Sequence, residues 1–234
     1  LAKVNKNLLI VNLSGTPVAM PWVNNVAGIV QAWYNGTESG NALASILMGD
    51  VNPSGKLPFS FPAKLTDIGA HSFDEGIYPG VNKEVTYREG LFVGYRWLDK
   101  EKIKPLFGFG HGLSYTTFSF GKVFADKKIM NENDKITFSM NIKNTGERDG
   151  AEVVQLYISD LKSSLPRPIK ELKGFEKVYL KAGAEKTISF TIDKSALSFF
   201  DDKKHDWVAE SGEFEAIMGS SANDVKGKVK FTLK

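Results

Sequence analysis

The fold of the C-terminal half is decided by the stretch Lys135-Ile136-Thr137-Phe138-Ser139-Met140-Asn141-Ile142-Lys143-Asn144-Thr145-Gly146. Polar and apolar side chains alternate over its first nine residues, which is the period of a strand with one buried and one solvent-facing side. The closing Asn-Thr-Gly is typical of a turn. The stretch therefore predicts one strand of an antiparallel sheet that covers a core on one face.

Further short strands follow this one, with Gly, Asn and Asp between them. The pattern predicts strands at Val153–Ile158, Phe175–Leu180, Thr187–Ile192, Phe214–Met218 and Val229–Leu233. About seven such strands over some 120 residues indicate an antiparallel β-sandwich of the immunoglobulin or fibronectin type.

The first sixty residues have the strand and helix pattern of an α/β domain instead. Leu8–Leu13 and Ala27–Tyr34 are apolar runs typical of strands covered on both faces of a parallel sheet, and Ser39–Met48 has helical spacing closed by Gly49. Two strands and a helix cannot cover themselves, so this unit is expected to be part of a larger domain. Because the sequence opens at Leu1 and reaches a buried-type strand almost at once, we expect a fragment of a longer protein.

Composition narrows the class of partner. The chain has 234 residues, 42% of them hydrophobic, and its 30 Lys and Arg against 27 Asp and Glu form no dense basic block. Neither a nucleic-acid nor a membrane partner is therefore expected. No apolar run approaches the roughly 20 residues of a membrane-spanning helix. The absence of cysteine excludes disulfides and thiolate chemistry.

Four unusual segments carry a resemblance to a known family. They are AWYNG at 32–36, GDVNPSGKLP at 49–58, YREGLFVGYR at 87–96 and PLFGFGHGLSYTTF at 105–118. In this order they resemble the family 3 glycoside hydrolases, of β-glucosidase type, that carry a fibronectin III-like domain. Segments of the sandwich also look like the family's pattern, at Asn144–Gly146, Gly150–Tyr157 and Leu172–Phe175.

The resemblance implies an architecture of an N-terminal barrel, an α/β sandwich and a fibronectin III-like domain. This chain would hold the C-terminal part of the α/β sandwich at 1–63, an aromatic-rich connecting segment at 64–112, and the complete fibronectin III-like domain at 113–234. The missing barrel and the upstream α/β segment would be its partners. The intact enzyme would hydrolyse terminal β-glucosides of oligosaccharides with retention, and would be periplasmic or secreted.

The resemblance also implies that this chain lacks the catalytic carboxylates. The family's aspartate nucleophile lies on the barrel, and its acid/base glutamate precedes the segment that matches Leu8–Leu13. We therefore assign no catalytic, cofactor-binding or metal-binding residue and expect the chain to be a scaffold, inactive alone. A rival hypothesis is a stand-alone carbohydrate-binding or adhesion module, which needs a self-sufficient N-terminus and an exposed aromatic platform. A third is a split enzyme whose upstream part is a separate chain, favoured by a large exposed apolar surface on the N-terminal region.

Five acidic residues are candidates for the carboxyl groups of a glycosidase. A retaining glycosidase needs two carboxyl groups about 5 Å apart, and the candidates are Glu38, Asp74, Glu75, Glu84 and Glu89. Sequence neighbours on an extended chain, such as the pair at 74 and 75, point to opposite sides. The last candidate, Glu89, is expected to form an ion pair with Arg88 or Arg96.

Other side chains have a structural reading as well. The three histidines, His71, His111 and His205, lack ligand spacing, and His111 is expected to be a turn residue at the domain junction. Stacking on sugar was considered for Trp33, Tyr34 and Trp97, but packing is expected instead. In Asn52-Pro53-Ser54 the central proline excludes glycosylation, and the glycine-rich Gly108–Gly112 is expected to open a strand, which gives no phosphate site.

Overall fold

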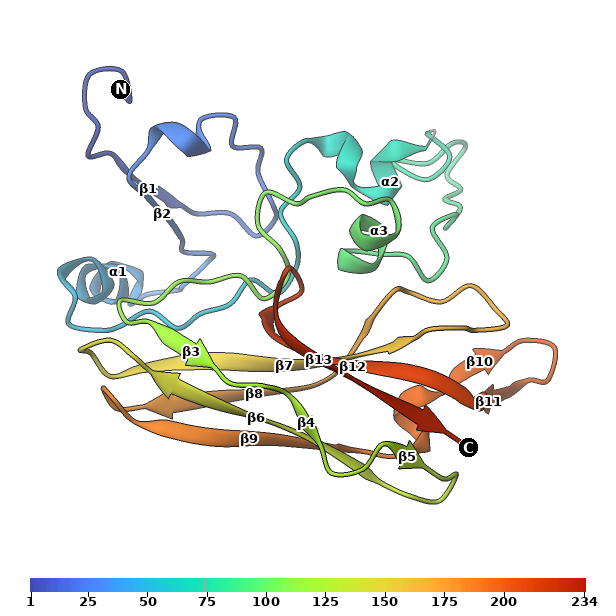
Figure 1. Ribbon diagram of the computed structural model, residues 1–234. Coiled ribbons are helices and arrows are strands. Elements are labelled where there is room, and N and C mark those ends of the chain that lie inside the picture. The colour runs from blue at the N-terminus through green and yellow to red at the C-terminus, as the bar shows by residue number, and fades with distance from the viewer. Residues whose placement is uncertain (74) are drawn as a thin grey trace.

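A β-sandwich of two sheets makes up the C-terminal half of the chain, below the N-terminal elements (Figure 1). The computed structural model describes residues 1–73 and 75–234, so Asp74 lies outside the described residues. The first sheet has the order β5 (Ile129–Met130), β13 (Asp224–Leu233), β12 (Gly212–Ser221), β7 (Gly150–Asp160) and β8 (Glu171–Leu180). In the second, β6 (Ile136–Asn144) pairs with β9 (Glu185–Ile192) and with the short β3 (Phe118–Phe120) and β4 (Phe124–Ala125). Except for β5 on β13, all these pairs are antiparallel.

The alternation in β6 places its apolar side chains in the core, as predicted. Ile136, Phe138, Met140 and Ile142 are at most 1% exposed. They meet the inward side chains of β7, β12 and β13, which belong to the same apolar cluster. The fibronectin-like sandwich is thereby confirmed.

Strand β7 is buried along nearly its whole length on both faces. Val154 and Leu156 belong to the sandwich core, whereas Tyr157 belongs to a second cluster that includes Tyr95 and Phe109 of the connecting segment. This sheet therefore has a covered outer face as well as a covered inner one. The outer face is where the N-terminal half of the chain rests.

The N-terminal elements form a small α/β unit. Strands β1 (Leu9–Asn12) and β2 (Gly28–Gln31) pair in parallel, and α1 (Ser39–Met48) follows with Gly49 in the left-handed conformation at its end. The helix confirms the predicted bounds, and both strands are shorter than predicted. In β2 the strand stops before Trp33, whose backbone φ is +54°.

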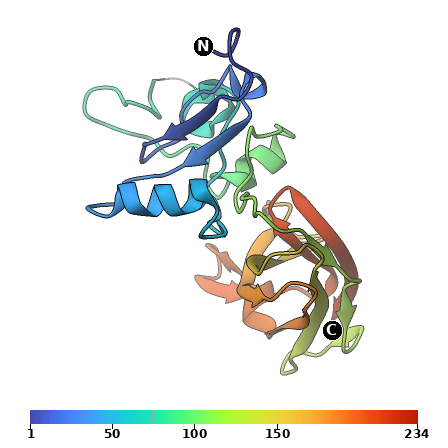
Figure 2. The same ribbon diagram turned by 90° about the vertical axis from the view of Figure 1, so that its left-hand side faces the viewer.

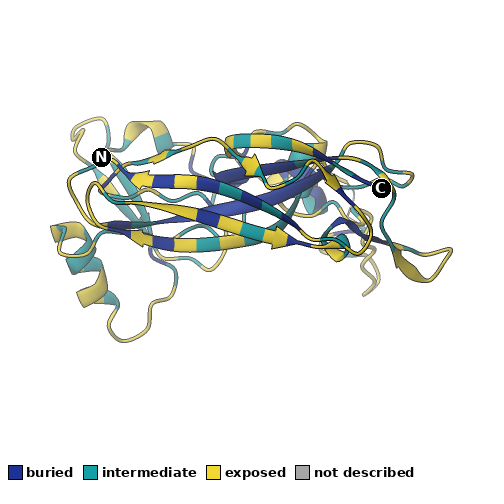
Figure 3. Ribbon diagram, turned by 60° about the horizontal axis from the view of Figure 1, so that its bottom comes forward, coloured by how far each residue is buried: buried dark blue, intermediate teal, exposed yellow. Residues whose placement is uncertain are grey.

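Neither face of this unit is covered within the described chain. No residue of β1, β2 or α1 is buried, and Figure 3 colours α1 only as intermediate or exposed. This agrees with the expectation that two strands and a helix cannot cover themselves, because the described residues supply no further strand or helix for these faces.

The sequence pattern did not predict several short helices and strands. They are the helical turns η1 (Val23–Asn25), η2 (Leu65–Asp67) and η3 (Lys194–Leu197), the helices α2 (Gly69–Ser72) and α3 (Tyr95–Lys100), and the hairpin of β10 (Phe199–Asp201) with β11 (Asp206–Val208). All have six residues or fewer, too few to show a hydrophobic period. The boundaries proposed at residues 63 and 112 stay predictions. None of the described helices is long and apolar enough to cross a membrane.

The sandwich core gives a direct stability prediction. Phe231 is 2% exposed and lies against Phe138 and Phe214, with ring centroids 5.1 and 5.6 Å apart. Phe231→Ala is expected to lower the free energy of unfolding by about 3–5 kcal/mol, because it removes buried contacts and leaves a cavity. Phe124→Ala, at a residue 63% exposed, is the control and should cost about 0.5 kcal/mol or less. Equal losses in denaturant titrations would contradict this core assignment.

Candidate functional site

The region that joins the α/β unit to the sandwich is the best-built polar site of the chain. Its base is a two-stranded ladder between residues 57–61 and 106–111. Leu57 makes both of its backbone hydrogen bonds to the second segment, at 2.9 and 2.8 Å, and the N–H of Phe61 donates to the carbonyl of Phe107 at 2.7 Å. The residues between the two segments therefore form one long excursion that returns to its starting point.

Asn52 ties this base to the sandwich through one amide group. Its Nδ2 donates to the carbonyl of Asp149 at 2.9 Å, and its Oδ1 accepts from the Ser114 hydroxyl and from the N–H of Tyr115, both at 2.8 Å. An amide can donate and accept at once, which is why this side chain can join three backbone segments.

Lys56 makes the second tie. Its ammonium lies 2.5 Å from Glu152 on β7 and donates to the carbonyl of Gly112 at 2.7 Å. The two charged side chains are only 13% and 11% exposed. Loss of one partner would therefore leave a poorly solvated charge.

The last turn of α1 is held from the sandwich side. The Tyr115 hydroxyl donates to the carbonyl of Ile46 at 2.9 Å, and Arg148 donates to the carbonyl of Gly49 at 3.2 Å. The Ile46 carbonyl also accepts from the Gly49 N–H at 3.1 Å, so the Tyr115 hydroxyl is its second donor, and Gly49 is the residue that caps the helix. The end of α1 is thereby fixed to the sandwich.

The glycines of the segment 108–112 permit this close approach. A Cβ on Gly110 would lie 2.5 Å from the Gln155 amide, and one on Gly112 would lie 2.1 Å from the carbonyl oxygen of Gly55. Gly110 also has a φ of +84°, which favours glycine. The segment leads to β3 only at Phe118, so the expected strand begins later than the glycines.

Helix α3 makes a separate contact with the sandwich. Asp99 lies 2.5 Å from Lys170, Arg96 lies 3.7 Å from Glu171, and the Tyr95 hydroxyl accepts from the N–H of Leu172 at 3.0 Å. The Tyr95 ring also stacks on Phe109 and meets the buried Tyr157 edge-on. Burial raises the pKa of Tyr157, which keeps this hydroxyl neutral.

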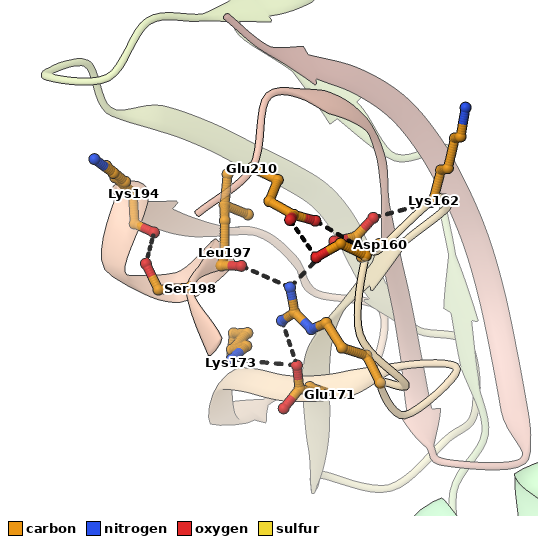
Figure 4. Close-up of polar contacts among 10 residues, drawn as sticks. Asp160, Lys162, Glu171, Lys173, Lys194, Leu197, Ser198 and Glu210 are labelled. Atoms are coloured by element: carbon orange, nitrogen blue, oxygen red, sulfur yellow. Dashed lines mark hydrogen bonds and ion pairs between the residues drawn. The ribbon is translucent and has the colours of Figure 1, made fainter. Parts of the chain in front are cut away.

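A buried guanidinium stabilises the sandwich next to that contact. Arg167 is 6% exposed and donates to Asp160 at 3.2 Å, to Glu171 at 2.6 Å and to the carbonyl of Leu197 at 2.8 Å. Figure 4 shows these acceptors converging from separate segments. Lys173 lies 3.8 Å from Glu171, and burial lowers the pKa of its ammonium against the opposing pull of that carboxylate. Glu171 thus links the Arg167 network to α3.

His111 lies within the junction, as its position between two glycines predicts. Its ring stacks on Phe107 at 5.1 Å. Burial, followed by the nearby Lys56 ammonium, holds the pKa of His111 below its ordinary value of 6.5, and Asp224 opposes the shift. The imidazole is therefore neutral near pH 7 and acts as an aromatic packing group.

Two clefts follow the seam. One, of about 570 Å³, is lined by Asp50, Arg148 and Asp149, and another, of about 500 Å³, is lined by Lys56 and Glu152. Their polar groups already contact one another. Asp149, for example, accepts from Tyr179 at 3.0 Å and from a backbone N–H, and these bonds lower the pKa of its carboxyl. The clefts are seams between packed segments.

The candidate carboxylates do not form a glycosidase pair in the described chain. Glu38, the residue before α1, accepts from Asn41 in the first turn of that helix, and Glu75 and Glu84 are exposed. The expected ion pair of Glu89 with Arg96 is wrong, because the Arg96 guanidinium lies near Glu171 instead, at 3.7 Å, whereas a pair of Glu89 with Arg88 stays a prediction. One carboxylate oxygen of Glu89 is buried without a hydrogen-bond partner. The remaining candidate, Asp74, lies outside the described residues.

Of the three aromatic residues that could stack on a sugar, two are packed within the chain and one is exposed. Trp33 meets Phe59 edge-on at 5.4 Å, and Trp97 is 7% exposed beside Phe73, so both pack as expected. Tyr34 is 78% exposed and lies over Gly15, where packing was expected. His71 meets Tyr78, and His205 occupies a hairpin turn at a φ of +52°. Within the described residues, no three His, Asp or Glu side chains gather as metal ligands.

Comparisons with known proteins agree with the geometry. Residues 1–95 match the glycosyl hydrolase family 3 C-terminal domain, and residues 152–222 match the fibronectin type III-like domain. The chain is 51% identical over 99% of its length to β-glucosidase BoGH3A of Bacteroides ovatus. The chain belongs to glycosyl hydrolase family 3. It is also 48% identical, over 96% of its length, to thermostable β-glucosidase B of Acetivibrio thermocellus.

Solved structures extend the family assignment to three dimensions. The chain aligns over its full length with β-glucosidase from Kluyveromyces marxianus in complex with glucose, at 44% identity and a TM-score of 0.92. DesR, a β-glucosidase from Streptomyces venezuelae, aligns at 38% identity with the same score. The chain covers 27% and 30% of these two structures, and 31% and 29% of the two curated relatives. It matches their C-terminal portion, and none of these relatives supports a stand-alone binding module.

Sequence reasoning missed the residues that build the junction. The sequence predicts no structural role for Asn52 or Lys56, although both contact the sandwich. The sequence feature that could have revealed them is the pair of polar residues flanking Pro-Ser-Gly, in a region that has no hydrophobic periodicity. The burial of Arg167 and Asn144 gave no signal, because a buried polar residue cannot be told from an exposed one by composition.

The Lys56 tie predicts a measurable stability loss. Lys56→Met is expected to lower the free energy of unfolding by about 1–3 kcal/mol, because the Glu152 carboxylate is left with little water and one donor fewer. Lys186→Met is the control, because it removes a pair of the same kind, Lys186 with Glu176 at 2.9 Å, whose side chains are 54% and 39% exposed. It should change stability by about 0.5 kcal/mol or less. Similar effects of both variants in urea titrations would refute a special role for Lys56.

His111 predicts a pH dependence of stability. Its folded pKa is lowered, so between that pKa and 6.5 the unfolded chain binds a proton that the folded chain does not. The free energy of unfolding should therefore rise with pH up to about 6.5 and fall below it. His111→Gln should flatten this slope, measured by urea titration at pH 5.5 and 7.5, whereas the exposed His205→Asn should not. An unchanged slope in the first variant would count against burial of this imidazole.

Proposed function

We propose that this chain is the C-terminal scaffolding portion of a β-glucosidase. The whole enzyme would hydrolyse terminal β-glucosides with retention through a covalent glycosyl intermediate. The relatives that support this are named β-glucosidases, and the chain matches about 30% of their length. Both catalytic carboxylates would belong to the part of the enzyme outside this chain.

The observation that carries the proposal is the uncovered α/β unit. Most residues of β1 and β2 are leucine, isoleucine or valine, yet no residue of either strand is buried. None of the ten residues of α1 is buried either. A parallel sheet requires cover on both faces. The exposed apolar side chains of this region are Leu1, Val4, Leu9, Leu13, Tyr34, Leu47, Met48 and Val51. These faces would be completed by the upstream α/β segment of the same enzyme.

Scaffolding contributes to the chemistry through geometry. The acid/base glutamate would be carried by the sheet that β1 and β2 extend. Catalytic groups must be held within about 0.5 Å of the productive geometry, so a loosely held sheet would reduce the rate. The two ties at Asn52 and Lys56 give that sheet a fixed support.

The remaining partners follow from the same proposal. The chain would contact the N-terminal barrel and the upstream α/β segment, and an oligosaccharide would bind in the intact enzyme. The enzyme would be periplasmic or secreted. The exposed apolar surface suits association with an upstream part on the same polypeptide or on a separate chain.

The test is hydrolysis of a chromogenic β-glucoside. The purified chain should be inactive alone, and activity should appear on mixing with a separately produced upstream part. Leu9→Asp should reduce the recovered activity by at least about tenfold, because a charge on β1 opposes burial against the remaining sheet. Phe124→Asp, on an exposed residue of the sandwich, is the matched control and should leave recovery unchanged. Strong hydrolysis by the chain alone would refute the assignment of both carboxylates to the missing part.

A further inference from the structure

A second apolar surface lies on the excursion between the two halves of the ladder. Between residues 78 and 93, six large apolar side chains are 47–85% exposed. They are Tyr78, Val81, Val85, Tyr87, Leu91 and Val93, and together they are called the loop surface. Singly exposed apolar residues are ordinary on proteins, but six within sixteen positions are a cluster.

The loop that carries these side chains has a defined backbone. Val81 and Glu84 exchange two backbone hydrogen bonds, at 3.0 and 2.9 Å, and Thr86 donates to the carbonyl of Gly76 at 2.9 Å. The Phe92 N–H donates to the carbonyl of Glu89 at 3.0 Å. The loop surface is therefore held in shape by its own backbone while its side chains face outward.

The loop is also anchored at its C-terminal end. It leads through Gly94 into α3, which the sandwich holds through Tyr95, Arg96 and Asp99. Trp97, on α3, is buried behind the loop. Any part of the protein that binds the loop surface would thus be connected to the sandwich through the short helix α3.

The environment beneath the loop is incomplete. Glu89 Oε2 and Trp97 Nε1 are both buried without a hydrogen-bond partner. Both side chains lie over Gly69, where an added Cβ would be 3.0 Å from Glu89 Cγ and 3.1 Å from the Trp97 indole. More than nine in ten buried polar groups are paired in native proteins, so these two unpaired atoms make the packing beneath the loop unusual.

We infer that the loop surface is a second docking site for the portion of the enzyme outside this chain, separate from the α/β faces. The relatives are about three times as long as this chain, so a body large enough to cover both surfaces is part of each of them. In Figure 2 the loop and α1 project to the same side of the molecule, away from the sandwich. One body can therefore contact the unit at β1 and α1 and the sandwich-anchored loop together. This inference rests on the proposed function only for the identity of that body.

Hydrogen exchange in the full-length enzyme tests the inference. Backbone amides of residues 84–93 should exchange at least about tenfold more slowly in the full-length enzyme than in the 234-residue chain. The β10–β11 hairpin, residues 199–208, is the internal control and should exchange equally in both. Equal exchange of 84–93 in the two proteins would overturn the inference. Protection in the 234-residue chain that grows with its concentration would assign the surface to a second copy and overturn it as well.

Substitutions give an independent readout. Tyr87→Ser and Val93→Ser should each lower the unfolding temperature of the full-length enzyme by several degrees and leave that of the 234-residue chain unchanged, because both side chains are exposed there. Phe175→Ser, at a residue 68% exposed on β8, is the matched control and should change neither protein. No change in the full-length enzyme would refute docking. Hydrolysis of a β-glucoside by the unsubstituted full-length enzyme reports the proposed function separately, so the two can fail independently.

Discussion

The structure depends on one constraint: the segments 57–61 and 106–111 must pair while Lys56 and Phe109 contact the outer face of β7. Leu57 and Phe61 form the pairing bonds, and Lys56, immediately before them, reaches Glu152 on the sandwich. Only glycine allows this approach at residues 110 and 112, where any Cβ would overlap a neighbouring atom. The ladder thereby turns a long irregular excursion into a closed loop with a rigid base, and it explains why β7 is buried on both of its faces.

The contacts of the chain divide into complete and incomplete ones. The junction residues are buried and hydrogen-bonded, as in the Arg167 network and in Asn144, which is 0% exposed and accepts from Thr116 at 2.7 Å. The α/β unit and the loop surface are apolar and exposed, and the unpaired atoms Glu89 Oε2 and Trp97 Nε1 lie beneath the latter. The junction with the sandwich is therefore closely packed, whereas the α/β unit and the loop surface are left uncovered. Such a division is expected of one part of a larger assembly, because polar networks are costly when partly satisfied and apolar faces gain most from cover.

The sequence predicted most of the sandwich, because its strands are long enough to show a period of two. The helix Ser39–Met48 was also predicted correctly, since its apolar spacing and the following glycine agree. Prediction failed where tertiary contacts replace local pattern. Helix α3 has six residues and exists because Trp97 is buried on one side and Asp99 is held by Lys170 on the other. The pairing of Glu89 with an arginine was predicted from sequence proximity, but Glu171, distant in sequence, is the carboxylate that lies near Arg96.

A part without catalytic groups can still determine how an active site is held. The end of α1 is fixed by Tyr115 and Arg148, which donate to the carbonyls of Ile46 and Gly49. Through these two bonds the sandwich sets the position of a helix that follows directly from β2. If the proposed function holds, the neighbouring strands of that sheet lead to the acid/base glutamate. The path from the sandwich to the chemistry would then run through backbone hydrogen bonds of an ordered sheet, which transmit displacement better than a flexible linker does. The sandwich would accordingly affect the rate through the position of the glutamate, without contact with substrate.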